Sequence, residues 1–371
     1  MPGIYVHIPF CRRKCHYCDF YSLALLSKEQ DFVDALCREI AQASPDKETA
    51  ETIYFGGGTP SLLSDKSLER IMLSIRQNFE ITKGAEISLE ANPEDIRPES
   101  LKIWKELGFN RLSIGIQSTD DRILSFLGRK HSSRESLKSL EEAQKSGFEN
   151  VSADLIYGIP GLNHSIWEKC IKTILSTGIQ HLSAYHLTIE PGTLLNRRLK
   201  QNHFALPADE ESYHQFMLLF DITEKEGFPW YEISNFAKKD FHSRHNAAYW
   251  DDTAYYGFGP SAHSYDGENI RSWNLSDLND YIAKGGINAE QEYLDGKDKF
   301  NDYLITRLRT RRGLEFGEME KRFGSTKLSA LKRKLRVYTD TGKAKIEGDC
   351  FRLKPESLFI SDSILKDIIY I

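Results

Sequence analysis

The sequence predicts an α/β protein whose core is a partial, open barrel of six parallel strands. Three observations predict this class: short apolar strands alternate with helical stretches, glycines close several of those helical stretches, and polar residues mark the strand ends. Strand–helix–strand alternation implies parallel pairing through right-handed crossovers. Six units are fewer than the eight of a closed barrel, so the sheet is expected to remain open.

The strands and helices of this core follow from the spacing of apolar residues. The stretch from Gln30 to Ala43, for example, has Phe32, Leu36 and Ile40 at helical spacing, and Gly108 stops a later helix. The six predicted strands are Val6–Ile8, Thr52–Phe55, Glu86–Ala91, Arg111–Gln117, Val151–Ile156 and His181–Leu187. The predicted helices between them are Gln30–Ala43, Leu68–Phe79, Glu99–Leu107, Asp120–Leu127, Arg134–Ser146 and Ser165–Thr177.

The remaining chain predicts two further regions. Residues 188–206 form a connection, and 207–297 form a middle α/β extension with a helix at 209–226, a strand at 230–236 and a stretch rich in aromatics and glycine. From residue 298, three helical stretches precede two short strands and a last helix, an order typical of a winged-helix domain. We therefore expect domains at 1–206, 207–297 and 298–371.

Composition excludes several classes of protein. Of 371 residues, 40% are hydrophobic and 28% charged, and no apolar run approaches the roughly 20 residues of a membrane span. No signal-peptide pattern opens the chain, so a cytoplasmic location is expected, including a peripheral position at the inner membrane face. The net charge is −5, yet residues 298–371 hold 17 Lys and Arg against 11 Asp and Glu. A solvated basic face explains this better than nucleic-acid binding, because no basic patch interleaved with aromatics accompanies it.

Three cysteines follow the first strand at the spacing C-x3-C-x2-C: Cys11, Cys15 and Cys18. Thiolates are the usual ligands of iron–sulfur clusters, and three of them leave one iron of a four-iron cluster open to a small molecule. Zinc is the competing interpretation, but it requires a fourth ligand, for which His16 is the neighbouring candidate. A disulfide suits a secreted chain, and three buried structural thiols are the plainest alternative. The other cysteines are scattered and are expected to be packing residues.

Polar residues mark the ends of the other five predicted strands. They are Thr59, Glu90, Gln117, Asp154 and His186. The carboxyl ends of barrel strands carry the functional site, and here the first strand delivers the cysteine loop to the same end. A single polar strand end is usually a turn or a cap, whereas five of them beside a cysteine loop predict a site.

With its flanks Tyr5, His7–Phe10 and Tyr17–Phe20, the cysteine loop resembles the cluster motif of the radical S-adenosylmethionine (radical SAM) enzymes. It is most similar to the family of oxygen-independent coproporphyrinogen III oxidases and their haem-chaperone relatives. The resemblance implies the partial (β/α)6 barrel as radical SAM core and a [4Fe–4S] cluster on Cys11, Cys15 and Cys18. It further implies S-adenosylmethionine on the open iron, with an electron donor such as flavodoxin or ferredoxin where radical chemistry occurs.

The same resemblance implies the residues that contact S-adenosylmethionine. Carboxylates suit ribose hydroxyls or an ammonium group, and arginine suits a carboxylate in bidentate fashion. Glycines after a strand permit a ligand to approach the backbone, although a tight turn explains them equally well when they are taken alone. The residues carried over are Tyr5, Gly57, Gly58, Thr59, Glu90, Gln117, Arg129, Asp154 and Thr188.

A second motif, His245-Asn246-x-x-Tyr249-Trp250, lies in the middle region. A neutral imidazole is a good ligand for haem iron, and flanking aromatics can cover a macrocycle. A histidine satisfied within an aromatic core is the alternative. The motif resembles that of the haem-chaperone branch, which implies haem bound through His245, with Tyr249 and Trp250 over the ring. Further candidates around the same pocket are His242, His263, Tyr185 and His186.

Two departures separate this chain from the oxidases that it resembles. Phe20 stands where those enzymes carry a fourth cysteine, and only four residues precede Tyr5 where they have a longer arm. We therefore expect a haem chaperone that delivers haem to an apo-protein such as a membrane respiratory cytochrome, and assign no catalytic residue. The alternative is oxygen-independent oxidative decarboxylation of coproporphyrinogen III in porphyrin biosynthesis. A monomer and a haem-dependent dimer are both compatible with the sequence.

Overall fold

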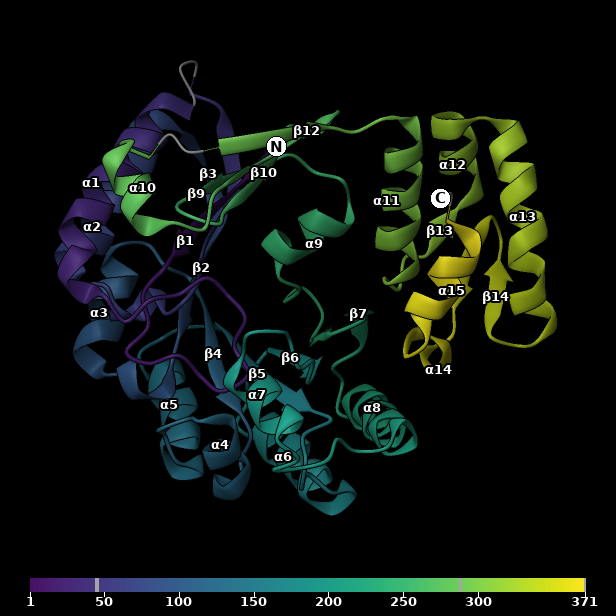
Figure 1. Ribbon diagram of the computed structural model, residues 1–371, viewed down its shortest axis with the longest axis horizontal. Helices are drawn as coiled ribbons and strands as arrows, with labels where there is room; N and C mark the ends of the chain where they lie inside the picture. Colours follow the sequence, from purple (N-terminus) through teal and green to yellow (C-terminus); the bar gives the residue numbers. More distant parts are fainter. Residues whose placement is uncertain (44–46, 287–288, 370–371) are drawn as a thin grey trace.

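The computed structural model describes residues 1–43, 47–286 and 289–369. Its centre is a large sheet in which six parallel strands follow one another in chain order, as predicted (Figure 1). These strands are β1 (Gly3–Ile8), β2 (Thr49–Gly57), β3 (Glu80–Ala91), β4 (Arg111–Gln117), β5 (Asn150–Tyr157) and β6 (His181–His186). The partial α/β barrel predicted from the sequence is confirmed, with β3 beginning six residues earlier than expected.

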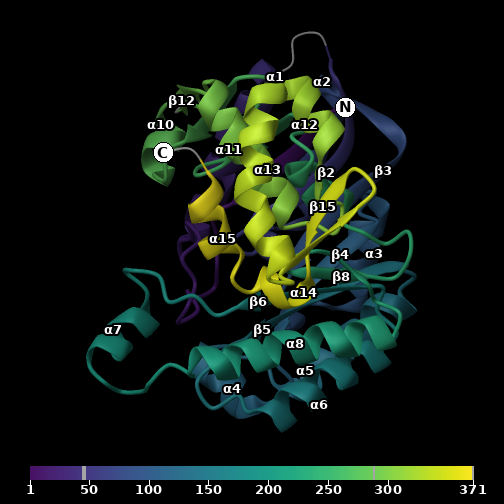
Figure 2. The ribbon, with the colours of Figure 1, turned by 90° about the vertical axis from the view of Figure 1, so that its right-hand side faces the viewer.

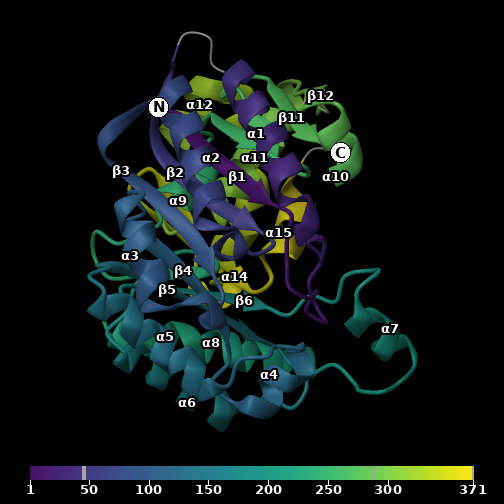
Figure 3. The same cartoon turned by 90° about the vertical axis from the view of Figure 1, so that its left-hand side faces the viewer.

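Helices on the outer side of the strands make the crossovers (Figure 3). They are α1 (Glu29–Ala43), α2 (Asp65–Asn78), α3 (Pro98–Glu106), α4 (Asp121–Leu127), α5 (Ser133–Lys145) and α6 (His164–Ser176). Their boundaries follow from the sequence: Ser132 and Glu135 form a capping box at the start of α5, and Gly128 ends α4 in the left-handed conformation. Their apolar faces pack on the sheet, where Ile4 and Leu112 have no exposed surface.

The middle region does not stand apart from this sheet but extends both of its edges. At one edge β7 (Trp230–Glu232) and β8 (Asn235–Ala237) replace the single strand expected there, and β8 pairs antiparallel with β6. At the other edge β9 (Tyr255–Phe258) pairs parallel with β1. It is followed by β10 (His263–Tyr265), β11 (Ile270–Asn274) and β12 (Ala289–Tyr293), so the sheet has twelve strands in the described residues.

The glycines of the middle region serve close packing. A Cβ at Gly257 would lie 1.8 Å from the main-chain oxygen of His263, and one at Gly259 would lie 2.5 Å from that of His7. Gly259 also has a positive φ of 99°, which only glycine adopts readily. These two positions therefore let β9 lie against both β1 and β10, and the segment is tightly packed.

Four helices accompany the middle region. They are α7 (Leu194–Lys200) within the expected connection, α8 (Asp209–Lys225) as predicted, α9 (Arg244–Trp250) and α10 (Leu278–Ala283). Helix α8 packs against α6 and contacts β5 and β7, and α10 lies against α1. Helix α9 carries the His-Asn-x-x-Tyr-Trp motif, and its N-cap Ser243 accepts a hydrogen bond from the main-chain nitrogen of Asn246.

The C-terminal region has the predicted winged-helix order. Its elements are α11 (Gly296–Leu308), β13 (Leu314–Glu315), α12 (Phe316–Phe323), α13 (Ser325–Asp340), β14 (Ala344–Glu347), β15 (Cys350–Leu353), α14 (Pro355–Leu358) and α15 (Ser361–Ile368). The last two residues of the predicted domain, 370 and 371, lie outside the described residues. Helix α14 lies over α8 (Figure 2), and the ring of Phe359 contacts those of Phe216 and His186. Among the described helices, none is long and apolar enough to cross a membrane.

Candidate functional site

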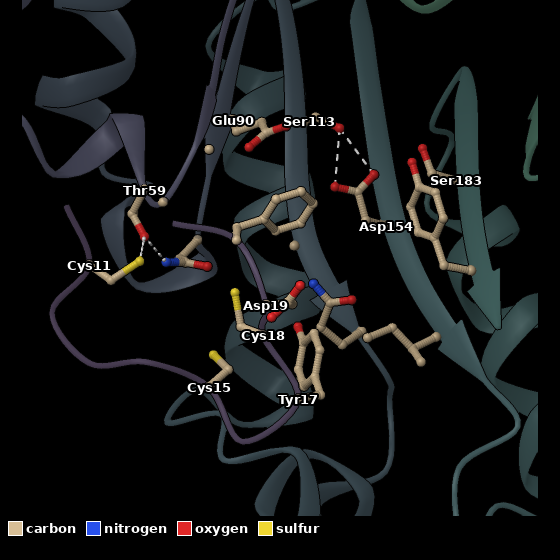
Figure 4. Close-up of a pocket in the computed structure, with 18 of the residues that line it drawn as sticks. Cys11, Cys15, Tyr17, Cys18, Asp19, Thr59, Glu90, Ser113, Asp154 and Ser183 are labelled. Atoms are coloured by element: carbon tan, nitrogen blue, oxygen red, sulfur yellow. Dashed lines mark hydrogen bonds between the residues drawn. The ribbon is translucent and has the colours of Figure 1, made fainter. Parts of the chain in front are cut away.

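A cavity of about 900 Å³ lies at the carboxyl ends of β1–β6 (Figure 4). The three cysteines line it, and so do all five polar strand ends singled out in the sequence. Most of the other predicted site residues line it as well. The predicted residues found in its wall are Tyr5, Cys11, Cys15, Cys18, Gly57, Gly58, Thr59, Glu90, Gln117, Arg129, Asp154, Tyr185, His186, Thr188, Tyr249 and His263.

The cysteine loop is held by main-chain hydrogen bonds to segments on both sides of it. The nitrogen of Cys11 donates to the oxygen of Leu23 at 3.1 Å, and that of His16 donates to Leu127 at 3.0 Å. All three thiols are free, and Thr59 Oγ1 lies 3.4 Å from Cys11 Sγ. His16 is turned away, with Nδ1 against the oxygen of Phe126 at 2.8 Å. The loop thus presents three thiols to one cavity without the fourth ligand that structural zinc requires.

Three thiols on one loop are a ligand set that an iron–sulfur cluster takes. Among the described residues, no three His, Cys, Asp or Glu side chains are gathered closely enough to hold one metal ion. A cubic cluster takes one thiolate on each of three separate irons, so its ligands need not converge on one point. Burial raises the pKa of Cys15, and it raises that of Cys18 to about 11, so metal binding must displace these protons. The residues present therefore fit a cluster with one open iron.

The glycine run at the end of β2 fixes the position of the cysteine loop. The nitrogen of Gly58 donates to the oxygen of Ile8 at 2.8 Å, and that of Thr59 donates to Phe10 at 2.7 Å. A Cβ at Gly58 would lie 2.5 Å from the oxygen of Phe10. Gly57 has φ of 104°, so it too is restricted to glycine. The run is therefore a close-packed junction as well as a part of the cavity wall.

Two half-buried carboxyl groups face the cavity from β3 and β5. Tyr54 donates its hydroxyl hydrogen to Glu90 at 2.7 Å, and Ser113 donates to Asp154 at 3.0 Å. Burial raises the pKa of both groups, that of Glu90 to about 7. Each carboxyl keeps acceptor capacity toward the cavity, which suits hydroxyl or ammonium groups of a ligand.

Arg129 and Gln117 complete this side of the cavity. The guanidinium of Arg129 donates to Asn92 Oδ1 and to the hydroxyl of Tyr17, both at 2.7 Å, while its Nε has no partner within the described residues. Gln117 ends β4 with φ of 64°, an unusual conformation for a residue other than glycine. Such local strain is concentrated at functional sites, and here it lies in the cavity wall.

His245 occupies a different environment from the one predicted for a haem ligand. Its ring is 2% exposed and does not line the cavity. Nδ1 lies 2.8 Å from Thr52 Oγ1, Nε2 lies 2.9 Å from the hydroxyl of Tyr249, and the ring stacks on Tyr54 at 5.1 Å. Burial lowers its pKa to about 3. Both ring nitrogens are engaged, which favours the alternative of a core histidine.

The other aromatic and histidine candidates divide between the cavity and the surrounding protein. Trp250 does not line the cavity, and its main-chain oxygen accepts a hydrogen bond from Arg307 at 2.9 Å. His242 is also outside, stacked on Tyr231 at 4.2 Å. Tyr249 lies in the wall, beside Asn246 of the same helix.

Several lining residues were missed in the sequence. They include Tyr54, Asn92, Ser113, Ser183 and Tyr255. Ser113, Gly115 and Gln117 alternate along β4, so strand periodicity counted back from the predicted strand end would have found the serine. Tyr255 gave no such signal, because β9 was not recognised as a strand.

Comparisons with known proteins agree on one family. The model of the radical SAM superfamily matches residues 5–174. The heme chaperone HemW of Bacillus subtilis is 35% identical over 87% of this chain and 87% of its own length. That of Mycobacterium tuberculosis is 33% identical over 99% and 94%. Among solved structures, the radical SAM enzyme coproporphyrinogen III oxidase (HemN) of Escherichia coli matches with a TM-score of 0.86 and 22% identity, over 99% of this chain and 90% of its own.

Proposed function

The chain belongs to the haem-chaperone (HemW) branch of the radical SAM superfamily, and on this premise we propose that it binds haem and passes it to an apo-protein. The observation that carries the proposal is a cavity that joins a three-thiol loop to an aromatic wall. Its volume of about 900 Å³ is at the upper end of ordinary ligand sites, which suits more than one bound group. A membrane respiratory cytochrome is the acceptor that we propose.

Cys11, Cys15 and Cys18 would hold a [4Fe–4S] cluster, which together with S-adenosylmethionine and an electron donor would supply radical chemistry. Around it, the chain provides acceptors at Glu90 and Asp154 for ribose or ammonium hydrogens. The remaining proposed contacts are Tyr5, Gly57, Gly58, Thr59, Gln117, Arg129 and Thr188, all in the cavity wall. A flavodoxin or ferredoxin is the class of donor that such a cluster would use.

The haem would lie against the cavity side formed by α9, β9 and β10. Tyr249 and Tyr255 stand there with their rings 4.7 Å apart and nearly perpendicular. Aromatic side chains of this kind supply apolar area to a macrocycle while their hydroxyl groups stay in polar contact. The side belongs to the extension of the sheet beside β1, so the haem would be adjacent to the cluster loop.

Decarboxylation of coproporphyrinogen is not part of the proposal, although the chain shares its fold with a coproporphyrinogen III oxidase. Phe20, in the place of the fourth cysteine of the resembled oxidases, has 68% of its surface exposed and lines the cavity. Reconstituted protein supplied with reductant and S-adenosylmethionine should therefore leave coproporphyrinogen III unchanged. Detectable protoporphyrinogen would favour the oxidase instead.

The proposal is tested by anaerobic reconstitution with iron and sulfide, followed by haem titration and transfer. We expect wild-type protein to bind haem stoichiometrically. The bound haem should then pass to an apo-cytochrome faster than the same apo-cytochrome takes up free haem. Protein that holds its cluster but binds no haem would contradict the chaperone function. Bovine serum albumin loaded with haem is the control for passive release.

A further inference from the structure

The cavity contains three histidines, and they differ in whether a ring nitrogen is available. His7 is 3% exposed, with Nδ1 at 3.1 Å from the hydroxyl of Tyr5 and Nε2 at 2.9 Å from the oxygen of Tyr21. Within the described residues, the ring nitrogens of His186 and His263 have no hydrogen-bond partner, and both residues are exposed. His186 or His263 can therefore ligate a metal ion without breaking an existing hydrogen bond.

The surroundings of His186 leave its ring less accessible than that of His263. A Cβ at Gly158 would lie 2.5 Å from His186 Nε2, so this nitrogen faces the main chain. The ring is also enclosed edge-on by Tyr157 at 5.2 Å and by Phe359 at 6.1 Å. These neighbours leave less of the His186 ring open to the cavity.

His263 has the opposite arrangement, because its ring packs on a neighbouring side chain and is open to the cavity. It begins β10, where it pairs with Trp273 of β11, and the two rings stack at 6.0 Å and 28°. The cavity wall on the same side contains Tyr249 and Tyr255, and Ser261 precedes it in the same loop. The indole thus lies beside the imidazole, and the ring nitrogens of His263 stay available to a ligand.

The loop that carries His263 is rigid. The nitrogen of Ala262 donates to the oxygen of Gly259 at 3.1 Å, and that of Asn274 donates to Ala262 at 2.9 Å. Asn274 Nδ2 and the nitrogen of Gly259 also donate to the half-buried carboxyl of Glu39 on α1, at 2.6 and 2.9 Å. A ligand on such a support is held in place before the metal arrives.

We propose that His263, rather than the motif residue His245, is the protein ligand of haem iron, with the macrocycle lying along Tyr249 and Tyr255. This assignment rests on the proposed haem binding and names the residue that carries it. It follows from the free, supported and cavity-facing imidazole of His263, set against the two occupied nitrogens of His245. Asn246, also in the wall, is then available to a haem propionate or to solvent.

The experiment is haem titration of the cluster-loaded wild-type protein and of His263→Ala, His263→Gly, His186→Ala and His245→Gln, read by absorption and by electron paramagnetic resonance of the ferric haem. We expect His263→Ala to lose the imidazole-ligated spectrum and to bind haem at least about tenfold more weakly, a change of about 1.4 kcal/mol. His186→Ala should retain both properties. Free imidazole should restore the spectrum of His263→Gly, an effect that a merely structural role would not produce.

Different results overturn different parts of the proposal. If His263→Ala binds haem with the wild-type spectrum and affinity, the ligand assignment is wrong and haem binding itself stands. If His245→Gln stays folded and loses the imidazole signature while His263→Ala keeps it, the motif histidine is the ligand. Wild-type protein that binds no haem would overturn the proposed function together with the assignment.

Discussion

Replacement of His245 by alanine should destabilise the protein by about 3 kcal/mol. The hydroxyl of Thr52 would lose its buried partner, at a cost of about 1 kcal/mol. The stack on Tyr54 contributes about another 1 kcal/mol, and the space left by a ring that is 2% exposed adds a cavity term of similar size. Tyr249 faces the cavity, so its hydroxyl can be hydrated after the substitution and adds little.

Urea unfolding under anaerobic conditions, without haem, measures this loss. His263→Ala is the matched control, because its ring is exposed and its nitrogens have no partner within the described residues, so its stability should change by less than about 0.5 kcal/mol. His245→Ala should thus lose stability, whereas His263→Ala should lose the haem spectrum. The slope of the unfolding curve should be the same in all three proteins.

The effect of His245→Ala should also depend on pH in a definite direction. The pKa of His245 in the folded protein, about 3, is below the ordinary value of 6.5, so the neutral ring contributes stability above about pH 6.5 that is lost as the pH falls. Wild-type protein should lose about 2 kcal/mol from this group between about pH 6.5 and pH 5, at about 1.4 kcal/mol per unit. The variant lacks the group, so the difference between them should shrink to about 1 kcal/mol.

A stability loss below about 1 kcal/mol at neutral pH, combined with loss of haem binding, would refute the reasoning. It would mean that the ring is not held as the structure has it and that His245 is free to meet the iron. A pH-independent difference would separately show that the ring is solvated in the folded protein.

Three further predictions concern the cluster and the half-buried carboxyl of Glu39. Cys15→Ser should abolish the broad visible absorbance of reconstituted protein, whereas Cys37→Ser, against α2 and outside the cavity, should keep it; equal spectra would remove the cluster assignment. Gly58→Ala should lower the cluster content, because its Cβ would lie 2.5 Å from a main-chain oxygen of the cluster loop, while Gly296→Ala, with no neighbour within 4 Å, should not; iron and sulfide analysis decides. Burial raises the pKa of Glu39 to about 7 from its usual 4.5, so the stability contributed by its protonated carboxyl is present below about pH 4.5 and lost as the pH rises through 7. In Glu39→Gln the urea midpoint should therefore vary less with pH over that range, and the same pH dependence as in wild-type protein would contradict this prediction.

Much of the core could be predicted because its signals are local. Apolar periodicity located β1–β6, and the polar residues at their ends could be assigned to one site because parallel strands bring their carboxyl ends together. Glu90, Gln117 and Asp154 indeed line the same cavity as the cysteine loop. Predicting these residues required only the direction of the strands and no knowledge of distant contacts.

The arrangement of the middle region depended on distant contacts and was missed. Strands β7–β12 are three to five residues long, and β12 is exposed along its whole length, so they show neither the length nor the apolar pattern of the core strands. The environment of His245 was ambiguous for the same reason. A histidine followed by two aromatics has the same sequence pattern whether those rings face a macrocycle or the histidine itself. The contacts of His245 with Thr52 and Tyr54 on β2 distinguish the two cases.

The pairing of β1 with β9 has a consequence for the synthesis of the chain. Gly3 and Tyr255 are partners although about 250 residues separate them, so one edge of the first strand made stays unpaired until the middle region has emerged. At about 5–20 residues per second, that interval lasts roughly ten to fifty seconds. An open strand edge is a template for aggregation, and non-local pairing slows folding. A ribosome that stalls before residue 255 therefore leaves one edge of the central sheet unpaired and open to pairing with another chain.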